Sequence, residues 1–423
     1  MCGNGVVEAG ETCDPPGGSA CDETCQISAC SSDEPGALVA CHQGTPDLAL
    51  AGIDEVFLAA FSGRLSGTTF AAEIRRFDAA SQLLDAAAIP ISMDPADPPN
   101  TSFKVSSATA GGASFHVAMT GGASFSGGGF RSVLRKREVP KIGSALIAPV
   151  EIASNVPFGA CTSYLAGPIG IAAGLSGGEA RTTYRRLFGC DGGVLFETIT
   201  GVSGGFSAPP PGNTSVGSAP LARGSRDLAG VWWNQFIPDL TPPLLFAQSL
   251  RVSWLEPGPA TLVDLISVHP DLPHSESPAL AASGDVFLAV FALAPNFSDR
   301  ELTTLRGLRF SREEGLLDPP NGLLLASGGG VLDQIVVDGD AEGFLIGYTE
   351  ELVGGERRVL TMRVGVDGSF GLPAVVDTAI PVTIGQGAPI DIDVVSTGSG
   401  SFLGYTSVND AGYVSVRIIR LDP

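Results

Sequence analysis

The chain has 423 residues, 44% of them hydrophobic and 16% charged, and a formal net charge of −21. So acidic a surface repels phosphate backbones, which disfavours nucleic-acid binding. No apolar run approaches the roughly 18 residues that a membrane helix needs, which excludes a transmembrane segment. The 56 glycines and 31 prolines favour many short strands joined by turns, so we expect a soluble all-β protein.

Residues 1–33 form a cysteine-rich segment with almost nothing apolar to bury. Since such a segment cannot build a hydrophobic core, cross-links must replace one, and we predict a small disulfide module in an oxidising compartment. Zinc is less favoured there, because oxidation consumes the thiolates that zinc needs. The expected framework, whose connectivity is open, contains Cys2, Cys13, Cys21, Cys25, Cys30 and Cys41.

Six oxygen-bearing side chains lie close together in the same segment. A calcium ion takes six to eight oxygen ligands, so these side chains can be interpreted as a calcium site. The alternative is a set of solvated turn residues, and the spacing does not match an EF-hand loop. Calcium is the one cofactor that the sequence suggests. The six residues are Asn4, Glu8, Glu11, Asp14, Asp22 and Glu23.

Residues 2–14 (CGNGVVEAGETCD) and 21–26 (CDETCQ) carry the most specific motif of the chain. They resemble the cysteine-rich repeat of secreted proteins from myxobacteria and related deltaproteobacteria. The chain departs from that repeat after Asp14, where Pro15–Gly18 replaces the usual Asp-Gly-Asn. The resemblance implies a bacterial protein that is secreted or held at the cell surface. Because Met1 directly precedes Cys2, we expect a leader that has been removed rather than a signal peptide within this sequence.

Beyond this segment, an apolar strand entered through a tight polar turn recurs seven times, at intervals of 58, 56, 61, 55, 57 and 58 residues. A repeat of this length contains four recognisable short strands, which is the unit of a β-propeller blade. We therefore predict a seven-bladed β-propeller over residues 34–423. The marker residues of the repeats are Phe57, Phe115, Ile171, Trp232, Phe287, Phe344 and Phe402.

An arginine recurs on one strand of several repeats, and the strand that follows tends to open with an apolar-Asp pair. A ring of such pairs could bind a ligand, but a residue that recurs at one blade position usually has the same structural role in each copy. We therefore expect exposed structural pairs, each worth about 0–1 kcal/mol. Residues 76–92 also resemble propeller repeats of secreted proteins from the same bacteria. The recurring arginines include Arg76, Arg251, Arg309 and Arg363, and the recurring aspartates are Asp85, Asp264, Asp318 and Asp377.

Cys161 and Cys190 are the only cysteines outside the first 41 residues, so elimination suggests a bridge between them. We place Cys161 on the first strand and Cys190 on the third strand of one repeat. Strands two apart in a sheet are separated by roughly 10 Å, which is beyond disulfide reach. The two cysteines therefore remain a candidate pair.

Residues 201–226, rich in Gly, Ser and Pro, are expected to form a long surface loop.

No motif indicates catalysis, because no Ser or Cys is joined to a His and an Asp by a recognisable pattern. We therefore assign no catalytic residue. Residues 338–343 resemble a short calcium loop, but a plain acidic hairpin is favoured. The fourth repeat holds every tryptophan, and burial in the blade core is favoured over a ligand platform. The histidines and tryptophans are His42, His116, His269, His274, Trp232, Trp233 and Trp254.

We expect a non-enzymatic binding or scaffold protein, a monomer whose partner is an extracellular protein or a glycan. The alternative is an extracellular propeller enzyme that acts on polysaccharide or glycoconjugate. A pocket of several hundred Å³ with converging carboxylates and a buried Arg or His would favour the enzyme. A shallow mouth lined by Gly, Ser and Ala would favour the binding protein.

The seventh repeat lacks one strand, and propellers commonly complete the last blade with a strand from the start of the chain. We predict that Ala37–Cys41 pairs with Tyr413–Leu421 and so removes an exposed sheet edge. Cys41 could then tie the cysteine-rich segment to the propeller.

Overall fold

The computed structural model of the chain consists of strands and turns, and its described residues contain no helix, hence none that could cross a membrane. The chain divides into two compact units, residues 1–153 with 377–423, and residues 154–376. The described residues are 30, 34–66, 69–92, 101–124, 130–143, 146–154, 157–158, 161–175, 180–190, 193–197, 214–216, 220–236, 247–257, 261–266, 272–273, 278–294, 303–327, 330–352, 357–377, 391–408 and 413–421.

The chain has an all-β fold of the β-propeller class, made of antiparallel sheets in which most neighbouring strands are also neighbours in the sequence. Two sheets belong to the unit that contains both ends of the chain. The first, in spatial order, contains β28 (Ile392–Thr397), β29 (Gly400–Val408), β30 (Tyr413–Leu421), β1 (Ala37–Ile53), β2 (Val56–Ser66), β3 (Thr69–Asp78) and β4 (Ile89–Pro90). The second contains β5 (Ser102–Gly111), β6 (Ser114–Ser124), β7 (Phe130–Pro140) and β8 (Val150–Ser154).

Four sheets belong to the unit of residues 154–376. The third sheet of the chain contains β12 (Gly193–Glu197), β11 (Ala180–Cys190), β10 (Cys161–Ala173) and β9 (Pro157–Phe158). The fourth contains β13 (Thr214–Val216), β14 (Leu221–Arg223), β15 (Leu228–Phe236), β16 (Ala247–Glu256) and β17 (Thr261–Ile266). The fifth contains β18 (Leu272–Pro273), β19 (Ala279–Ser283), β20 (Val286–Ala294), β21 (Thr304–Ser311), β22 (Gly315–Leu316) and β23 (Leu323–Ser327). The sixth contains β24 (Gly330–Asp340), β25 (Gly343–Leu352), β26 (Arg357–Gly365) and β27 (Ala374–Asp377).

The prediction of seven separate blades is corrected, because the described strands form six sheets. The reason is the 17-residue strand β1, whose first half pairs with β30 and whose second half pairs with β2. The first and the seventh sequence repeats therefore share one seven-stranded sheet. A shift of register between Thr45 and Leu48 lies where β1 changes partner.

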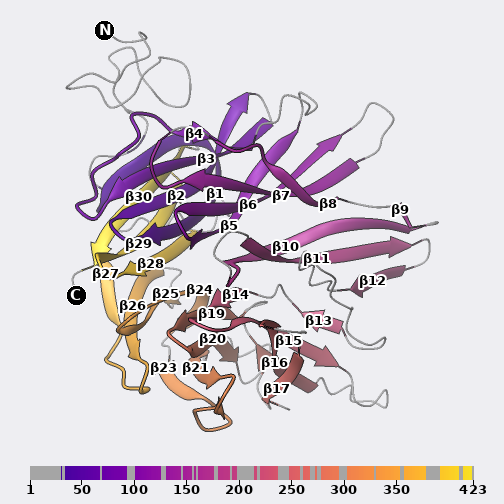
Figure 1. The fold of residues 1–423 in the computed structure, drawn as a ribbon, viewed down its shortest axis with the longest axis vertical. Helices are drawn as coiled ribbons and strands as arrows, with labels where there is room; N and C mark the ends of the chain where they lie inside the picture. Colours follow the sequence, from indigo (N-terminus) through magenta and orange to yellow (C-terminus); the bar gives the residue numbers. More distant parts are fainter. Residues whose placement is uncertain are drawn as a thin grey trace. The chain divides into compact units, whose positions relative to one another are not determined.

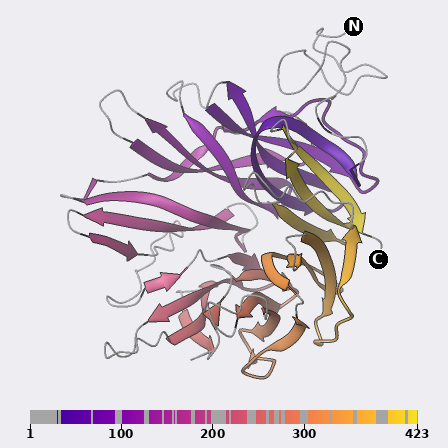
Figure 2. The ribbon, with the colours of Figure 1, turned by 180° about the vertical axis from the view of Figure 1, so that it is seen from behind.

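The predicted pairing between Ala37–Cys41 and Tyr413–Leu421 is present, since Ala37 lies opposite Ile418 and Cys41 opposite Ser415. Figures 1 and 2 show the yellow strands β28 to β30 beside the indigo strands β1 to β3. A disulfide joins Cys30 to Cys41, so the cysteine-rich segment is tied to β1 as expected. The edge of β30 is thus covered by the start of the described propeller strands.

Most marker residues of the sequence repeats occupy one position, at the start of the second strand of a hairpin. Phe57, Phe115, Phe287, Phe344 and Phe402 lie there with side chains that are fully buried. The third and fourth markers differ. Ile171 lies near the end of β10, and Trp232 lies in the middle of β15.

Two further expectations about the middle of the chain are wrong. Cys161 begins the second strand of its sheet rather than the first, and it lies directly opposite Cys190 on the adjacent strand β11. The supposed loop of residues 201–226 contains the short strands β13 and β14, both of which pair with β15. Their brevity explains why a composition rich in Gly, Ser and Pro concealed them.

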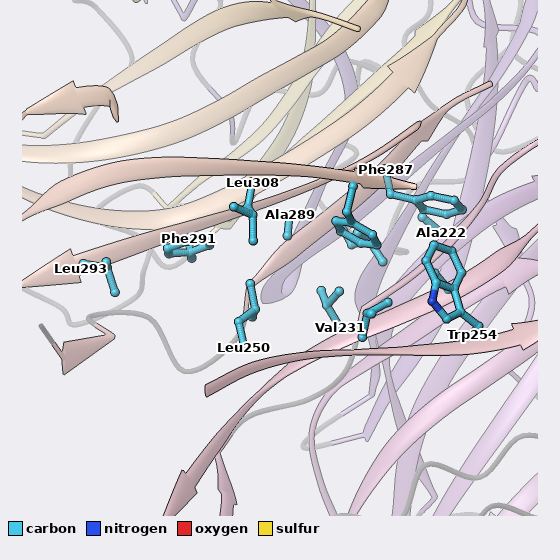
Figure 3. Close-up of a cluster of buried hydrophobic side chains, with 13 residues drawn as sticks. Ala222, Val231, Leu250, Trp254, Phe287, Ala289, Phe291, Leu293 and Leu308 are labelled. Carbon is cyan, nitrogen blue, oxygen red and sulfur yellow. The ribbon is translucent and has the colours of Figure 1, made fainter. Parts of the chain in front are cut away.

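Each unit contains apolar clusters, within one sheet or between neighbouring sheets. In the unit that holds both chain ends, Phe57, Phe77 and Phe402 form an aromatic cluster, with ring centroids 4.6 to 5.5 Å apart. In residues 154–376, Trp254 meets Phe287 and Phe310 in the same way. Figure 3 shows this second core as a row of side chains from Leu293 and Phe291 at one end to Trp254 at the other. These cores hold the turns of adjacent sheets in place.

Candidate functional site

A cavity of about 570 Å³ lies among the turns of the fourth, fifth and sixth sheets, within the unit of residues 154–376. It is the strongest candidate for a site among the residues that the structure describes, because it combines volume with many charged groups. Its walls come from the turn before β15, the β19–β20 turn, the turn after β21 and the turn after β26. The lining residues are Arg226, Asp227, Asp285, Val286, Arg309, Ser311, Arg312, Glu313, Glu314, Leu317, Val366 and Asp367.

Backbone bonds fix the two turns that carry Arg226 and Asp285. The amide of Ser225 donates to the carbonyl oxygen of Gly284 at 2.8 Å, which joins the turns directly. Gly284 has a φ of +60°, a conformation that glycine adopts without the strain of a Cβ atom. The tight turn that marks each sequence repeat therefore delivers a carboxylate to the cavity.

The outer part of the cavity is an exposed ion-pair network. Arg226 donates from Nε and lies 2.6 Å from Asp285 through Nη2, and the same nitrogen lies 3.6 Å from Glu313. The hydrogen bond to Asp285, and then the charge of that carboxylate, raise the pKa of Arg226. The second oxygen of Asp285, Oδ1, is buried and has no hydrogen-bond partner among the described residues. An acceptor is thus left over beside Arg226.

A second guanidinium, that of Arg312, is fixed from several sides. Its Nη1 lies 3.1 Å from Asp227 and donates to the carbonyl oxygens of Glu256 and Pro257 at 3.3 and 3.1 Å. Its carbon Cζ lies 5.9 Å from the ring centroid of Trp254, over the ring. So many partners hold the charge in one position.

The third guanidinium, that of Arg309, is only 9% exposed. It donates from Nε to Asp318 at 3.0 Å and from Nη1 to the carbonyl oxygen of Val366 at 2.5 Å. Asp318 also accepts the backbone amide of Arg309 at 2.6 Å. Arg309 therefore links the fifth sheet to the turn that follows β26, and it is already neutralised by a carboxylate outside the lining.

An equivalent arrangement occurs in the other unit. Arg76 donates from Nε to Asp85 at 3.0 Å, and its Nη1 donates to the carbonyl oxygens of Pro140 and Gly143 in the turn after β7. We call Arg76–Asp85 and Arg309–Asp318 the blade clamps. The expected structural role of these pairs is thus present, but their expected exposure is wrong, since all four side chains are at most 10% exposed.

The carboxylates of the cavity outnumber its guanidiniums, five to three. One of them, Asp367, accepts the hydroxyl and the backbone amide of Ser369 at 2.6 and 2.9 Å. These bonds, that of the hydroxyl first, lower the pKa of Asp367, so this group is an ionised acceptor and not a proton donor at neutral pH. The cavity is therefore equipped to hold polar and charged groups.

The predicted calcium ligands Asn4, Glu8, Glu11, Asp14, Asp22 and Glu23 lie outside the described residues, as do Cys2, Cys13, Cys21 and Cys25. Within the described ranges, no group of three or more His, Cys, Asp or Glu side chains is arranged to hold a metal ion. Residues 338–343 form the acidic hairpin that was favoured over a calcium loop. Asp340 accepts the amides of Glu342 and Gly343 and pairs with Arg363 at 3.1 Å.

The described histidines are structural. His42 is buried in β1 and stacks on Phe61 with ring centroids 5.4 Å apart. His116 is buried in β6, and this burial lowers its pKa, so the imidazole is neutral at neutral pH. His269 and His274 lie outside the described residues.

Trp254 is 5% exposed, so its expected place in the core is confirmed. The structure does not describe the side chains of Trp232 and Trp233. Trp254 nevertheless contributes to the site indirectly, because Arg312 lies over its ring.

Sequence reasoning found the Arg309 motif and the Asp285 turn, but it did not bring them together. The repeats themselves could have predicted their proximity, because equivalent turns of consecutive repeats lie at the same edge of adjacent blades.

A second carboxylate cluster joins β28 to β1 in the other unit. Asp391 accepts the amide of Leu48 at 2.7 Å, and Asp393 accepts that of Leu50 at 2.6 Å. Removal of the Asp391 carboxyl from solvent raises its pKa well above the ordinary range, and the nearby Asp47 and Asp393 add to the rise. The two carboxylates therefore have a structural role, because they accept hydrogen bonds from the backbone amides of Leu48 and Leu50 in β1.

No family model matches the sequence, and no curated protein matches it either. Solved structures with similar folds include Trypanosoma rangeli sialidase, at 9% identity and a TM-score of 0.41, covering 90% of this chain and 55% of that one. The β-propeller domain of the Trilobed protease from Pyrococcus furiosus matches at 9% identity and a TM-score of 0.40, with 90% and 98% covered. The Bombyx mori GH32 beta-fructofuranosidase matches at 10% identity and a TM-score of 0.33, with 63% and 58% covered.

The chain thus spans about half the length of the sialidases that it matches. These similarities assign it no activity.

Proposed function

We propose that this chain is a secreted or cell-surface binding or scaffold protein that recognises an extracellular protein or glycan through the charged cavity of residues 226–367. The observation that carries the proposal is the fixation of the three guanidiniums. Arg226, Arg309 and Arg312 are each held by a carboxylate, and the last two also by backbone carbonyl oxygens. These contacts hold the turns of the cavity, and with them its five carboxylates, in position before any ligand arrives, which lowers the entropic cost of binding.

The arrangement is less suited to acid-base catalysis. A general acid in a hydrolase needs a pKa raised toward neutrality, and the pKa of Asp367 is shifted the other way. The buried guanidinium of Arg309 is engaged by Asp318 and Val366 and does not point a free donor at a ligand.

One observation favours the alternative, an extracellular enzyme acting on polysaccharide or glycoconjugate. The cavity has several hundred Å³, converging carboxylates and a buried arginine, which is the combination expected of such a site. The two functions differ in whether a bound ligand is released unchanged.

A glycan and peptide array, probed with the purified chain with and without Ca²⁺, tests the proposal. We expect a set of bound ligands that is weakened in E313Q/E314Q, a change at two exposed cavity carboxylates, and kept in E55Q/E342Q, a matched change at two exposed turns outside the cavity. Each bound glycan is then incubated with the protein, and new reducing ends are measured. Release of reducing ends would make the chain an enzyme, and binding that E313Q/E314Q leaves unchanged would move the site elsewhere.

A further inference from the structure

We propose that the cavity binds the cationic side chain of a basic peptide segment that carries a large apolar residue next to its arginine or lysine. This inference rests on the proposed binding function and specifies its ligand. The cavity and the exposed residues of the turn after β26 form the surface, which we call the basic-peptide site.

The first argument is charge. Five carboxylates and three guanidiniums line the cavity, but Arg309 is already neutralised by Asp318, which is not part of the lining. Five acids therefore face two arginines. The chain as a whole carries −21, so its field draws a cationic partner toward the surface and repels an anionic one.

The second argument is the presence of acceptors without a firm partner. The side chain of Glu313 is 80% exposed, and its ion pair with Arg226 spans 3.6 Å. Glu314 lies beside it in a turn that the Ser311 hydroxyl fixes, since this hydroxyl accepts the Glu314 amide at 3.0 Å. A guanidinium or ammonium group supplies the donors that these oxygens lack.

The third argument is the apolar neighbour. Val366 lines the cavity and is exposed, and the chain continues from it to the exposed Phe370 and to Leu372, which is 93% exposed. Large apolar side chains exposed in succession beside a charged pocket are typical of an interaction surface. An apolar residue next to the cationic residue of a peptide would cover them.

The chemistry distinguishes a peptide from a metal ion or a phosphate. The described carboxylates are spread over several turns and form no group able to hold a metal. A phosphate would meet five carboxylates and would find both Arg226 and Arg312 already paired. A neutral sugar has no charge that the acidic excess would favour.

The probe is a short fluorescent peptide with an Arg-Phe pair among glycines and serines, and binding is measured by fluorescence anisotropy. We expect it to bind the wild-type chain, and the same peptide with Gln or Glu in place of Arg to bind far more weakly. Binding should weaken toward ~1 M salt, where the Debye length is about 3 Å. In E313Q/E314Q the dissociation constant should rise about fivefold, as expected for the loss of two exposed charge pairs.

The matched control is E55Q/E342Q, which removes the same charge from two exposed hairpin turns outside the cavity. Its dissociation constant should equal that of the wild type. The inference is overturned if the Gln peptide binds as well as the Arg peptide, if E313Q/E314Q binds like its control, or if the wild type binds no basic peptide. If the wild type binds no basic peptide but does bind glycans on the array, the proposed binding function stands and only the basic-peptide ligand is excluded. When nothing on the array binds, the proposed function itself fails.

Discussion

Arg309 and Asp318, nine residues apart, form an ion pair in which one carboxylate accepts the backbone amide, Nε and Nη2 of the same arginine. The other end of the guanidinium, Nη1, then donates to the carbonyl oxygen of Val366 in the turn that follows β26. Arg76 and Asp85 repeat this pattern, with the turn after β7 as the second partner. The recurring arginine of the sequence is therefore a device that joins one sheet to the following turn.

Removing only one charge of the Arg309–Asp318 blade clamp should destabilise the chain strongly. D318N leaves a buried guanidinium without its counter-charge, and we expect a loss of about 3–5 kcal/mol in the free energy of unfolding, measured by urea denaturation. R309M/D318L removes both charges and should recover part of the loss. A matched change at an exposed carboxylate, D54N, should cost little, because Asp54 pairs with Lys141 at the surface. Equal losses in D318N and D54N would contradict the clamp.

The sequence period was sufficient to locate hairpins where a phenylalanine follows the turn. It failed in the third repeat because β10 is apolar over much of its 13 residues, so that Ile171 resembles a strand start although Cys161 begins the strand. In the fourth repeat the position equivalent to the buried phenylalanine is occupied by the small Ala229, next to a shift of register after Leu228. The larger Trp232 was therefore assigned as the marker residue instead.

The number of sheets and the cavity could not be predicted for a different reason. Whether β1 breaks at Thr45 or continues through a bulge depends on both neighbouring strands, which no local pattern reports. The cavity is assembled from turns that lie far apart in the sequence, from Arg226 to Asp367. Each turn taken alone is an ordinary polar turn, so only their proximity creates the excess of acid.

Asp391 should make stability depend on pH. Its pKa in the folded chain is raised well above the usual value of about 3.9, so its contribution to stability is present below that value and is lost as pH rises through the folded pKa. D391N keeps an acceptor for the Leu48 amide but cannot ionise. Relative to the wild type, D391N should therefore gain stability as pH rises, as measured by urea denaturation over a pH series. A difference between the two proteins that stays constant with pH would refute this assignment.

Cys161 and Cys190 should form a disulfide. They lie directly opposite each other on adjacent antiparallel strands, where Cα atoms are about 4.5–5.5 Å apart, within the range that disulfides span. Peptide mapping by mass spectrometry without reduction should recover the linked peptides, together with those of Cys30 and Cys41. C161S/C190S should lower the free energy of unfolding by about 2–4 kcal/mol. Alkylation of both thiols in the unreduced protein would show that the pair does not form.

The residues just before β1 form the second anchor of the chain start. Glu34 Oε2 accepts the hydroxyls of Ser407 and Ser415 and Nε of Arg417, at 2.9, 2.7 and 2.9 Å. Arg417 also donates to the carbonyl oxygens of Glu34 and Gly36. These bonds fix the entry of β1 beside β30, independently of the disulfide at Cys41.

Deleting residues 34–43 should therefore destabilise the chain far more than deleting residues 1–33. The first deletion removes the strand pairing from Ala37 to Gln43 and takes the carboxylate of Glu34 away from Arg417, which is 3% exposed. E34Q isolates the second effect and should cost about 3–5 kcal/mol, since the buried guanidinium then loses the charge of the carboxylate that its Nε contacts. E55Q, at an exposed turn, is the matched control and should unfold at the wild-type urea concentration. If the two deletions lower the free energy of unfolding equally, the pairing of β1 with β30 does not hold the chain start in place. If E34Q unfolds at the same urea concentration as E55Q, the contact between Glu34 and Arg417 does not anchor it.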